Sequence, residues 1–240
     1  MGIENRRPQD CTVRHRRVEV DGFSIFYREA GHDDRPVVLL PHGYPSSSFQ
    51  FRDFMPALAD RWRLIAPDFP GFGYSDTPDH TRFAYTFEAY AGFLLRFTEV
   101  MNISRYALYL HDYGSQIGLR LAMKAPERVA ALIIQNGDIY EDQLGPKYKT
   151  FQEYWADPTP EGRRKLGEAV SVEGFREEFI NEVSERLLER ISPDLWTLAW
   201  SLMQSPERRE IAIKPLRISR RISIGSHDIR LTCGNIGRRR

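Results

Sequence analysis

The chain has 240 residues, of which 41% are hydrophobic, and its formal net charge is +1. This length supports one compact core with a small insertion, and a balanced charge argues against a nucleic-acid partner. No run of 18 apolar residues is present, residues 1–7 are too charged for a signal peptide, and Cys11 and Cys233 lie far apart, so we expect a cytoplasmic protein with no membrane contact, disulfide framework, metal or cofactor.

The first elements alternate apolar and polar residues. Residues 16–20 and 23–28 flank Asp21-Gly22, a pattern typical of a hairpin with a tight turn. The apolar runs that follow are short enough for central parallel strands, which are covered on both faces; they are residues 37–40, 63–66, 106–110 and 129–134. The sequence therefore predicts an α/β fold with a doubly wound, mostly parallel sheet.

Helical patterns separate these runs. The clearest begins behind Thr86, a candidate N-cap, and repeats apolar residues at helical spacing. Its apolar positions are Phe87, Tyr90, Phe93, Leu94, Phe97, Val100 and Met101. We interpret this stripe as a core-facing surface and not as a ligand site.

The composition changes after residue 141. Ser192-Pro193-Asp194 precedes an apolar helical face made of Leu195, Leu198, Ala199, Leu202 and Met203. We therefore divide the chain into a core at residues 1–141, a helical cap at 142–213 and a basic tail at 214–240.

Two of the predicted parallel strands lead into turns that contain chemically active residues. His42-Gly43-Tyr44-Pro45 follows one strand, and His111-Asp112-Tyr113-Gly114 joins another to a helix. A carboxylate on a strand-to-helix turn lies close to backbone N–H groups and can attack without a base in the first step, although it forms an ester that water must cleave. On these residues alone, Asp112 is a candidate nucleophile, a helix cap or a metal ligand.

A third segment, residues 68–76, reads D-F-P-G-F-G-Y-S-D. Together the three segments resemble the HG-x-P, D-x-PG-x-G-x-S and HD-x-G motifs of the α/β-hydrolase superfamily, in the branch of haloalkane dehalogenases and epoxide hydrolases. The resemblance implies an Asp112 nucleophile, oxyanion or halide-facing positions at Tyr44 and Tyr113, and a small uncharged substrate such as an epoxide or haloalkane. It also implies a cis peptide before Pro45.

Supporting positions follow from the same motifs. They are His42, Gly43 and Pro45 of the first motif and His111 and Gly114 of the motif that contains Asp112, and we expect the two histidines to hold loops through hydrogen bonds. The implied cap would line the pocket, for which the candidate residues are Tyr148, Tyr154, Trp155 and Trp196. Aromatic residues also bury large areas in ordinary packing, so these four remain open to that alternative.

The chain departs from the family pattern beside the nucleophile. Haloalkane dehalogenases usually carry Asn after HG and Trp after HD, whereas this chain has Tyr44 and Tyr113. The aromatic residue after HG fits the epoxide-hydrolase pattern better.

No histidine matches the base of the resembled family, which follows the last strand in a G-H segment. His15, His32 and His80 have no companion motif, and His227 lies in the basic tail. Asp138 is a candidate acid after the sixth strand, but Asn136 stands at the matching position.

The tail has no aromatic residue and carries seven Arg and one Lys against Asp228. Read in a shifted frame with free choice of synonymous codons, residues 222–239 permit N-I-D-W-F-P-R-H-S-S-Y-L-R-K-H-R-P-P, which resembles the related hydrolases at this point. The tail therefore indicates either a shifted reading frame, with loss of base and acid and little turnover, or a basic arm.

Two other functions remain open from the residues. A noncatalytic binding protein would keep the cap pocket and bind a partner through the tail. A nucleotide-binding domain would use Gly71-Phe72-Gly73 for phosphate, but this segment lacks the G-x-G-x-x-G spacing and the chain has no P-loop lysine.

Overall fold

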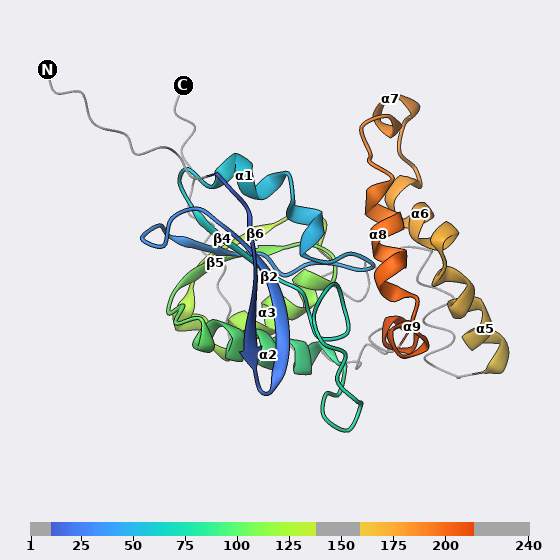
Figure 1. The fold of residues 1–240 in the computed structure, drawn as a ribbon, viewed down its shortest axis with the longest axis horizontal. Coiled ribbons are helices and arrows are strands. Elements are labelled where there is room, and N and C mark those ends of the chain that lie inside the picture. The colour runs from blue at the N-terminus through green and yellow to red at the C-terminus, as the bar shows by residue number, and fades with distance from the viewer. Residues whose placement is uncertain (1–10, 138–158, 214–240) are drawn as a thin grey trace, which may run out of the picture.

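The computed structural model describes residues 11–137 and 159–213 (Figure 1). Within these residues the core is a six-stranded sheet in the order β1-β2-β4-β3-β5-β6. The strands are β1 Arg14–Val20, β2 Phe23–Ala30, β3 Val37–Leu39, β4 Arg63–Pro67, β5 Tyr106–Leu110 and β6 Val129–Ile134. Strands β4, β3, β5 and β6 are parallel, and β1 and β2 add antiparallel strands at one edge. The predicted mostly parallel sheet is confirmed.

The hairpin between β1 and β2 has the predicted tight turn. Val20 pairs with Phe23 in the register. Asp21 and Gly22 have φ values of 51° and 77°, which are the positive angles that a two-residue hairpin turn requires.

Helices cover both faces of the sheet (Figure 1). The helical elements of the core are η1 Ser48–Phe51, α1 Phe54–Leu58, α2 Phe87–Val100, α3 Tyr113–Lys124 and η2 Pro126–Arg128. Leu39 joins the cluster that contains the α2 and α3 side chains, whereas its neighbour Val38 joins the cluster that contains Met55 of α1. Successive strand residues point to opposite faces, so α1 and the α2–α3 pair lie on opposite sides of the sheet.

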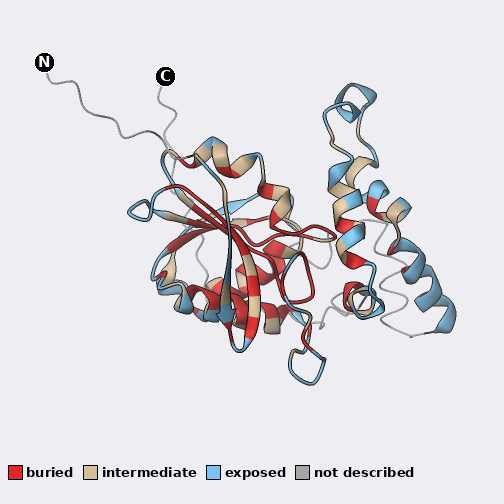
Figure 2. Cartoon of the chain, in the orientation of Figure 1, coloured by how far each residue is buried: buried red, intermediate tan, exposed pale blue. Residues whose placement is uncertain are grey.

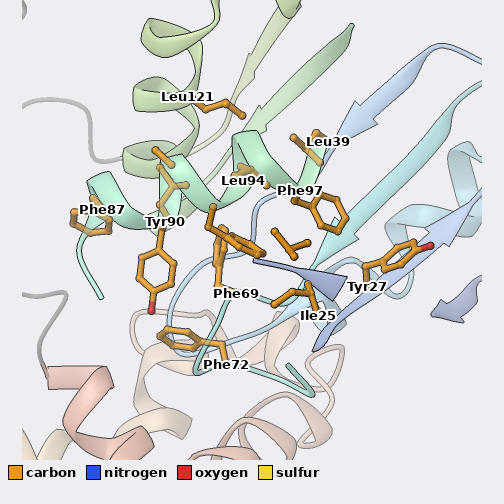
Figure 3. Close-up of a cluster of buried hydrophobic side chains, with 14 of the residues drawn as sticks. Ile25, Tyr27, Leu39, Phe69, Phe72, Phe87, Tyr90, Leu94, Phe97 and Leu121 are labelled. Carbon is orange, nitrogen blue, oxygen red and sulfur yellow. The ribbon is translucent and has the colours of Figure 1, made fainter. Parts of the chain in front are cut away.

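The main hydrophobic cluster gathers side chains from β2, β3, the 68–72 loop, α2 and α3 (Figure 3). The Thr86 side chain accepts a hydrogen bond from the Ala89 N–H and caps α2, as predicted. Phe97 is fully buried, but Val100 is 39% exposed. The prediction that Val100 belongs to the core is wrong, because it is the last residue of α2 and lies where solvent reaches the helix end.

Strand β6 forms where the apolar run predicts it, but its environment differs from the expected one. Among the described residues it pairs only with β5, and Ile133 and Ile134 are 44% and 49% exposed. The expectation that both faces of this strand are covered is therefore wrong for the described part of the chain.

Helices beyond the sheet lie at one side of the core (Figure 1). They are α5 Pro160–Ala169, α6 Val172–Ile180, α7 Glu185–Leu188, α8 Asp194–Met203 and α9 Pro206–Ile213. Most of their residues are exposed or intermediate, in contrast to the buried central strands of the sheet (Figure 2). We call α5–α9 the cap helices. The predicted cap boundary at 141/142 and the tail at 214–240 fall outside the described residues and stay predictions.

None of the helices in the described ranges is long and apolar enough to cross a membrane.

We expect Phe97→Ala to lower the free energy of unfolding by about 3–5 kcal/mol, because it removes a fully buried aromatic ring and leaves a cavity. Val100→Ala, on the same helix but exposed, should change it by less than about 1 kcal/mol. Urea denaturation monitored by circular dichroism measures both. Equal losses for the two variants would contradict the packing described for α2.

Candidate active site

Asp112 lies on the sharp turn that joins β5 to α3. Its backbone angles are φ 50° and ψ −134°, a region that L-residues rarely adopt and that surrounding structure must maintain. A Cβ on Gly114 would lie 2.3 Å from the Pro41 carbonyl oxygen. Glycine is therefore required at position 114, because a side chain there would keep the turn away from the segment that follows β3.

One oxygen of the Asp112 carboxylate accepts two backbone hydrogen bonds. The Tyr44 N–H donates to Oδ1 at 2.7 Å, and the Tyr113 N–H donates to the same atom at 2.6 Å. The two residues that the resemblance assigns to oxyanion or halide-facing positions therefore both donate backbone hydrogen bonds to Asp112. Because Tyr113 is also the first residue of α3, the positive end of the helix dipole adds to the stabilisation of negative charge here.

The loop that carries Tyr44 is held close to Asp112. A Cβ on Gly43 would lie 2.7 Å from Asp112 Oδ1, and the Gly43 N–H donates to Gln50 Oε1 at 3.0 Å. The Tyr44–Pro45 peptide is cis, as predicted.

His42 connects this loop to the next one. Its Nδ1 lies 3.0 Å from the Gly43 carbonyl oxygen, and its Nε2 accepts a hydrogen bond from the Phe69 N–H at 3.1 Å. Both ring nitrogens therefore serve backbone groups, with the proton on Nδ1. Burial lowers the pKa of His42 because the charged ring would be desolvated. The predicted loop-holding role of His42 is confirmed.

His111 differs from His42. Its Nδ1 is buried and has no hydrogen-bond partner among residues 11–137 and 159–213, so the described part of the chain does not show a loop-holding bond from this atom. His111 is the first residue after β5, and the backbone turns sharply at the next residue, Asp112.

Asp68 organises the loops behind the turn, a role that the motifs alone did not indicate. Its Oδ1 accepts the Ser48 N–H at 2.7 Å, and its Oδ2 accepts the Tyr74 N–H at 2.8 Å. Gly73 has φ 53°, and a Cβ there would lie 2.0 Å from Asp68 Oδ2. The glycines of the 68–76 segment thus let the backbone wrap around a buried carboxylate.

Aromatic rings adjoin the carboxylate. The Tyr44 and Tyr113 rings stack with centroids 5.5 Å apart, and Phe175 of α6 contacts Tyr44 edge-on at 5.9 Å. Burial, and then the charges of Glu178 and Asp112, raise the pKa of the Tyr44 hydroxyl. Phe175 and Glu178 were missed at the sequence level, because no motif marks them and only the packing of α6 against the core brings them here.

The other predicted site residues lie in different environments or outside the described ranges. Trp196 is half-buried and packs against the main hydrophobic cluster. The Asn136 carbonyl oxygen accepts the Asp112 N–H at 3.4 Å, while the residue itself is exposed. The residues that lie outside the described ranges are Asp138, Tyr148, Tyr154, Trp155 and His227.

The remaining described histidines have contacts of their own. The His15 ring stacks on Phe26 at 6.1 Å, His32 Nδ1 pairs with Asp34 at 2.9 Å, and His80 contacts Tyr85 edge-on at 5.1 Å. In residues 11–137 and 159–213, no group of three or more His, Cys, Asp or Glu side chains is arranged to hold a metal ion.

Comparisons with known proteins agree with the fold described above. The model of the alpha/beta hydrolase fold family matches residues 36–208. An uncharacterized hydrolase from Saccharomyces cerevisiae is 33% identical over 214 residues, which are 84% of this chain and 70% of the relative. A haloalkane dehalogenase from Mycolicibacterium paratuberculosis is 37% identical over 129 residues, 53% of this chain but only 41% of the dehalogenase. An epoxide hydrolase structure from Vigna radiata shares the fold, with a TM-score of 0.67 at 21% identity over 85% of this chain and 71% of that chain.

The buried neutral His42 predicts a pH dependence of stability. Its folded pKa is lowered, whereas the unfolded chain takes up the proton near pH 6.5. The stability that His42 contributes is therefore present above about pH 6.5 and is lost as the pH falls, by at most about 1.4 kcal/mol per pH unit. We expect urea denaturation to show a shallower fall between about pH 7.5 and 5.5 for His42→Gln than for the wild type.

His32→Gln, at an exposed position, is the matched control and should keep the wild-type slope. A His42→Gln variant with the full wild-type pH dependence would show that His42 is not held neutral by the fold.

Proposed function

Because the chain belongs to the alpha/beta hydrolase fold family, in the haloalkane dehalogenase and epoxide hydrolase-like branch, we propose that it uses Asp112 as a nucleophile on a small uncharged electrophile. The observation that carries this proposal is the pair of backbone N–H groups, from Tyr44 and Tyr113, on one Asp112 oxygen. Two donors on Oδ1 orient the carboxylate so that the other oxygen, Oδ2, is the attacking atom.

In the first step Oδ2 attacks a substrate carbon. With an epoxide, the ring C–O bond breaks, its electron pair goes to the ring oxygen, and the alkoxide takes a proton from water. With a haloalkane, the carbon–halogen bond breaks and halide leaves. Either reaction yields an ester on Asp112, and no base is needed to make this nucleophile.

In the second step the ester must react with water. A hydroxide equivalent adds to the carbonyl carbon, and negative charge develops on Oδ1, which the Tyr44 and Tyr113 N–H groups already contact. Donors that are in place before charge develops lower the barrier without reorganisation. The same two groups therefore support both steps of the proposal.

An epoxide is the substrate class that the residues beside the carboxylate favour. Tyr44 and Tyr113 stand where haloalkane dehalogenases usually present Asn and Trp, so the side-chain N–H donors for a halide are missing from these positions. The Tyr44 hydroxyl is protonated at neutral pH, and burial raises its pKa further, so Tyr44 brings a neutral aromatic ring and no charge to the site.

We further propose that the ester is hydrolysed slowly or not at all by this chain. His42 uses both ring nitrogens for backbone groups, and the rings of His15, His32 and His80 contact Phe26, Asp34 and Tyr85. None of these four histidines is placed to activate water at the ester, and His227 does not lie in a G-H segment of the family type.

The test is covalent labelling. We expect protein mixed with a small terminal epoxide to gain the mass of one whole epoxide, with the modification on the peptide that contains Asp112, because Oδ2 attacks and the ester persists. Asp112→Asn should reduce labelling by about 100-fold or more, since it removes the nucleophile. Asp53→Asn, at an 84% exposed carboxylate, is the control and should label like the wild type.

Absence of any adduct and of any turnover would contradict the nucleophile and favour a noncatalytic binding protein. Sustained epoxide hydrolysis that disappears in His227→Ala would contradict the second part of the proposal and make His227 the base.

A further inference from the structure

Arg208 of α9 is the most extensively hydrogen-bonded side chain between the described cap helices and the core. Its Nη1 donates to the Gly73 carbonyl oxygen at 2.7 Å, its Nη2 to the Ser75 carbonyl oxygen at 2.8 Å, and its Nε to Thr77 Oγ1 at 2.9 Å. Nη1 also donates to the Leu202 carbonyl oxygen at the end of α8, at 2.8 Å. One guanidinium group thus joins two cap helices to the loop of residues 71–77.

Apolar contacts lie beside these hydrogen bonds. Ile211, one helical turn after Arg208, is 1% exposed, and its Cδ1 lies 3.0 Å from the position that a Cβ on Gly71 would take. Burial lowers the pKa of Arg208 and the neighbouring charge of Asp68 opposes that effect. The loop of residues 71–77 is therefore held by the partly desolvated Arg208 guanidinium group, whose hydrogen bonds are stronger than those of an exposed cation.

Asp68 connects the loop of residues 71–77 to the turn that contains Tyr44. Tyr74, between the two carbonyl groups that Arg208 contacts, donates its N–H to Asp68 Oδ2, and Ser48 donates its N–H to Asp68 Oδ1. Ser48 lies four residues after Tyr44. In the turn between them, the Ser46 N–H donates a hydrogen bond to the Gly43 carbonyl oxygen at 3.1 Å. Hydrogen bonds and the short backbone segments between them therefore connect α9 to the N–H group that donates to Asp112.

We infer that Arg208 is a positioning residue that couples the cap helices, through the 71–77 loop and Asp68, to the Tyr44 N–H at the proposed nucleophile. The inference rests on the proposed function for its consequence, since it says that docking of the cap sets the rate of ester formation. Arg208 itself does not touch the reacting atoms. Lysine cannot reproduce the arrangement, because the planar guanidinium group donates to four acceptors at once.

Two readouts on Arg208→Met, Arg208→Lys and the wild type test the inference. The first is the rate of Asp112 ester formation with the same terminal epoxide. The second is amide hydrogen exchange, which reports local opening residue by residue. Arg163→Met is the matched control, because Arg163 pairs with Glu210 on the exposed side of the same helices.

We expect Arg208→Met to slow ester formation about tenfold or more, in the way that a small misplacement of an active-site group does. Exchange should accelerate in residues 44–48 and 71–77, while residues 106–124 stay within about twofold of the wild type, since β5 and α3 are held by their own hydrogen bonds. In both readouts Arg208→Lys should lie between Arg208→Met and the wild type, and Arg163→Met should match the wild type.

Faster exchange confined to residues 71–77, with residues 44–48 and the ester rate unchanged, would overturn the inference. So would an Arg208→Lys variant identical to the wild type in both readouts. If Arg208→Met does not fold, Arg208→Lys decides the matter, since it retains the charge and loses the fork. If the wild type forms no ester, the proposed function fails, while the exchange of residues 44–48 still decides whether α9 is coupled to the Tyr44 turn.

Discussion

Two backbone N–H groups meet on one carboxylate oxygen of Asp112, and they come from segments 69 residues apart in the chain. Tyr44 follows β3 and Tyr113 follows β5, and these strands are neighbours in parallel register, with Val37 opposite Tyr106. Neighbouring parallel strands end at the same edge of a sheet, so the two turns must meet there. This strand order is therefore the first requirement for any function of the site, because it brings the two turns together.

Close approach of the turns requires that side chains be absent at specific points. Gly43 and Gly114 stand where a Cβ would overlap Asp112 and the Pro41 carbonyl oxygen. Behind them, His42 and Asp68 occupy the space as hydrogen-bonding groups that bind the loops to one another. Buried polar groups that are satisfied in this way favour one arrangement of the backbone, because any other leaves them without partners. The strained backbone at Asp112 is maintained by this surrounding network.

Local signals explain which features the sequence predicted. The Asp21-Gly22 hairpin, the Thr86 cap and the Asp112 turn each depend on a few adjacent residues, so the pattern of residues is sufficient. The positions of Tyr44 and Tyr113 beside Asp112 followed from the resemblance to the hydrolase motifs, whereas the neighbouring order of β3 and β5 is seen only in the structure.

Other features depend on how distant segments pack, and the sequence could not reveal them. Phe175 reaches Tyr44 only because α6 lies against the core, and the contacts of Arg208 extend from α9 to a loop more than 130 residues earlier. The exposure of β6 and of Val100, and the lack of a partner for the buried His111 Nδ1 among the described residues, likewise depend on which neighbours are present and not on residue type.

A crystal structure of the protein after reaction with a small epoxide would test the central claim most directly, because it would show which atom of Asp112 is modified. The account predicts continuous electron density from Oδ2 to a substrate carbon, with Oδ1 as the ester carbonyl oxygen still accepting from the Tyr44 and Tyr113 N–H groups. Density that joins the substrate to Oδ1, or to a residue other than Asp112, would contradict it.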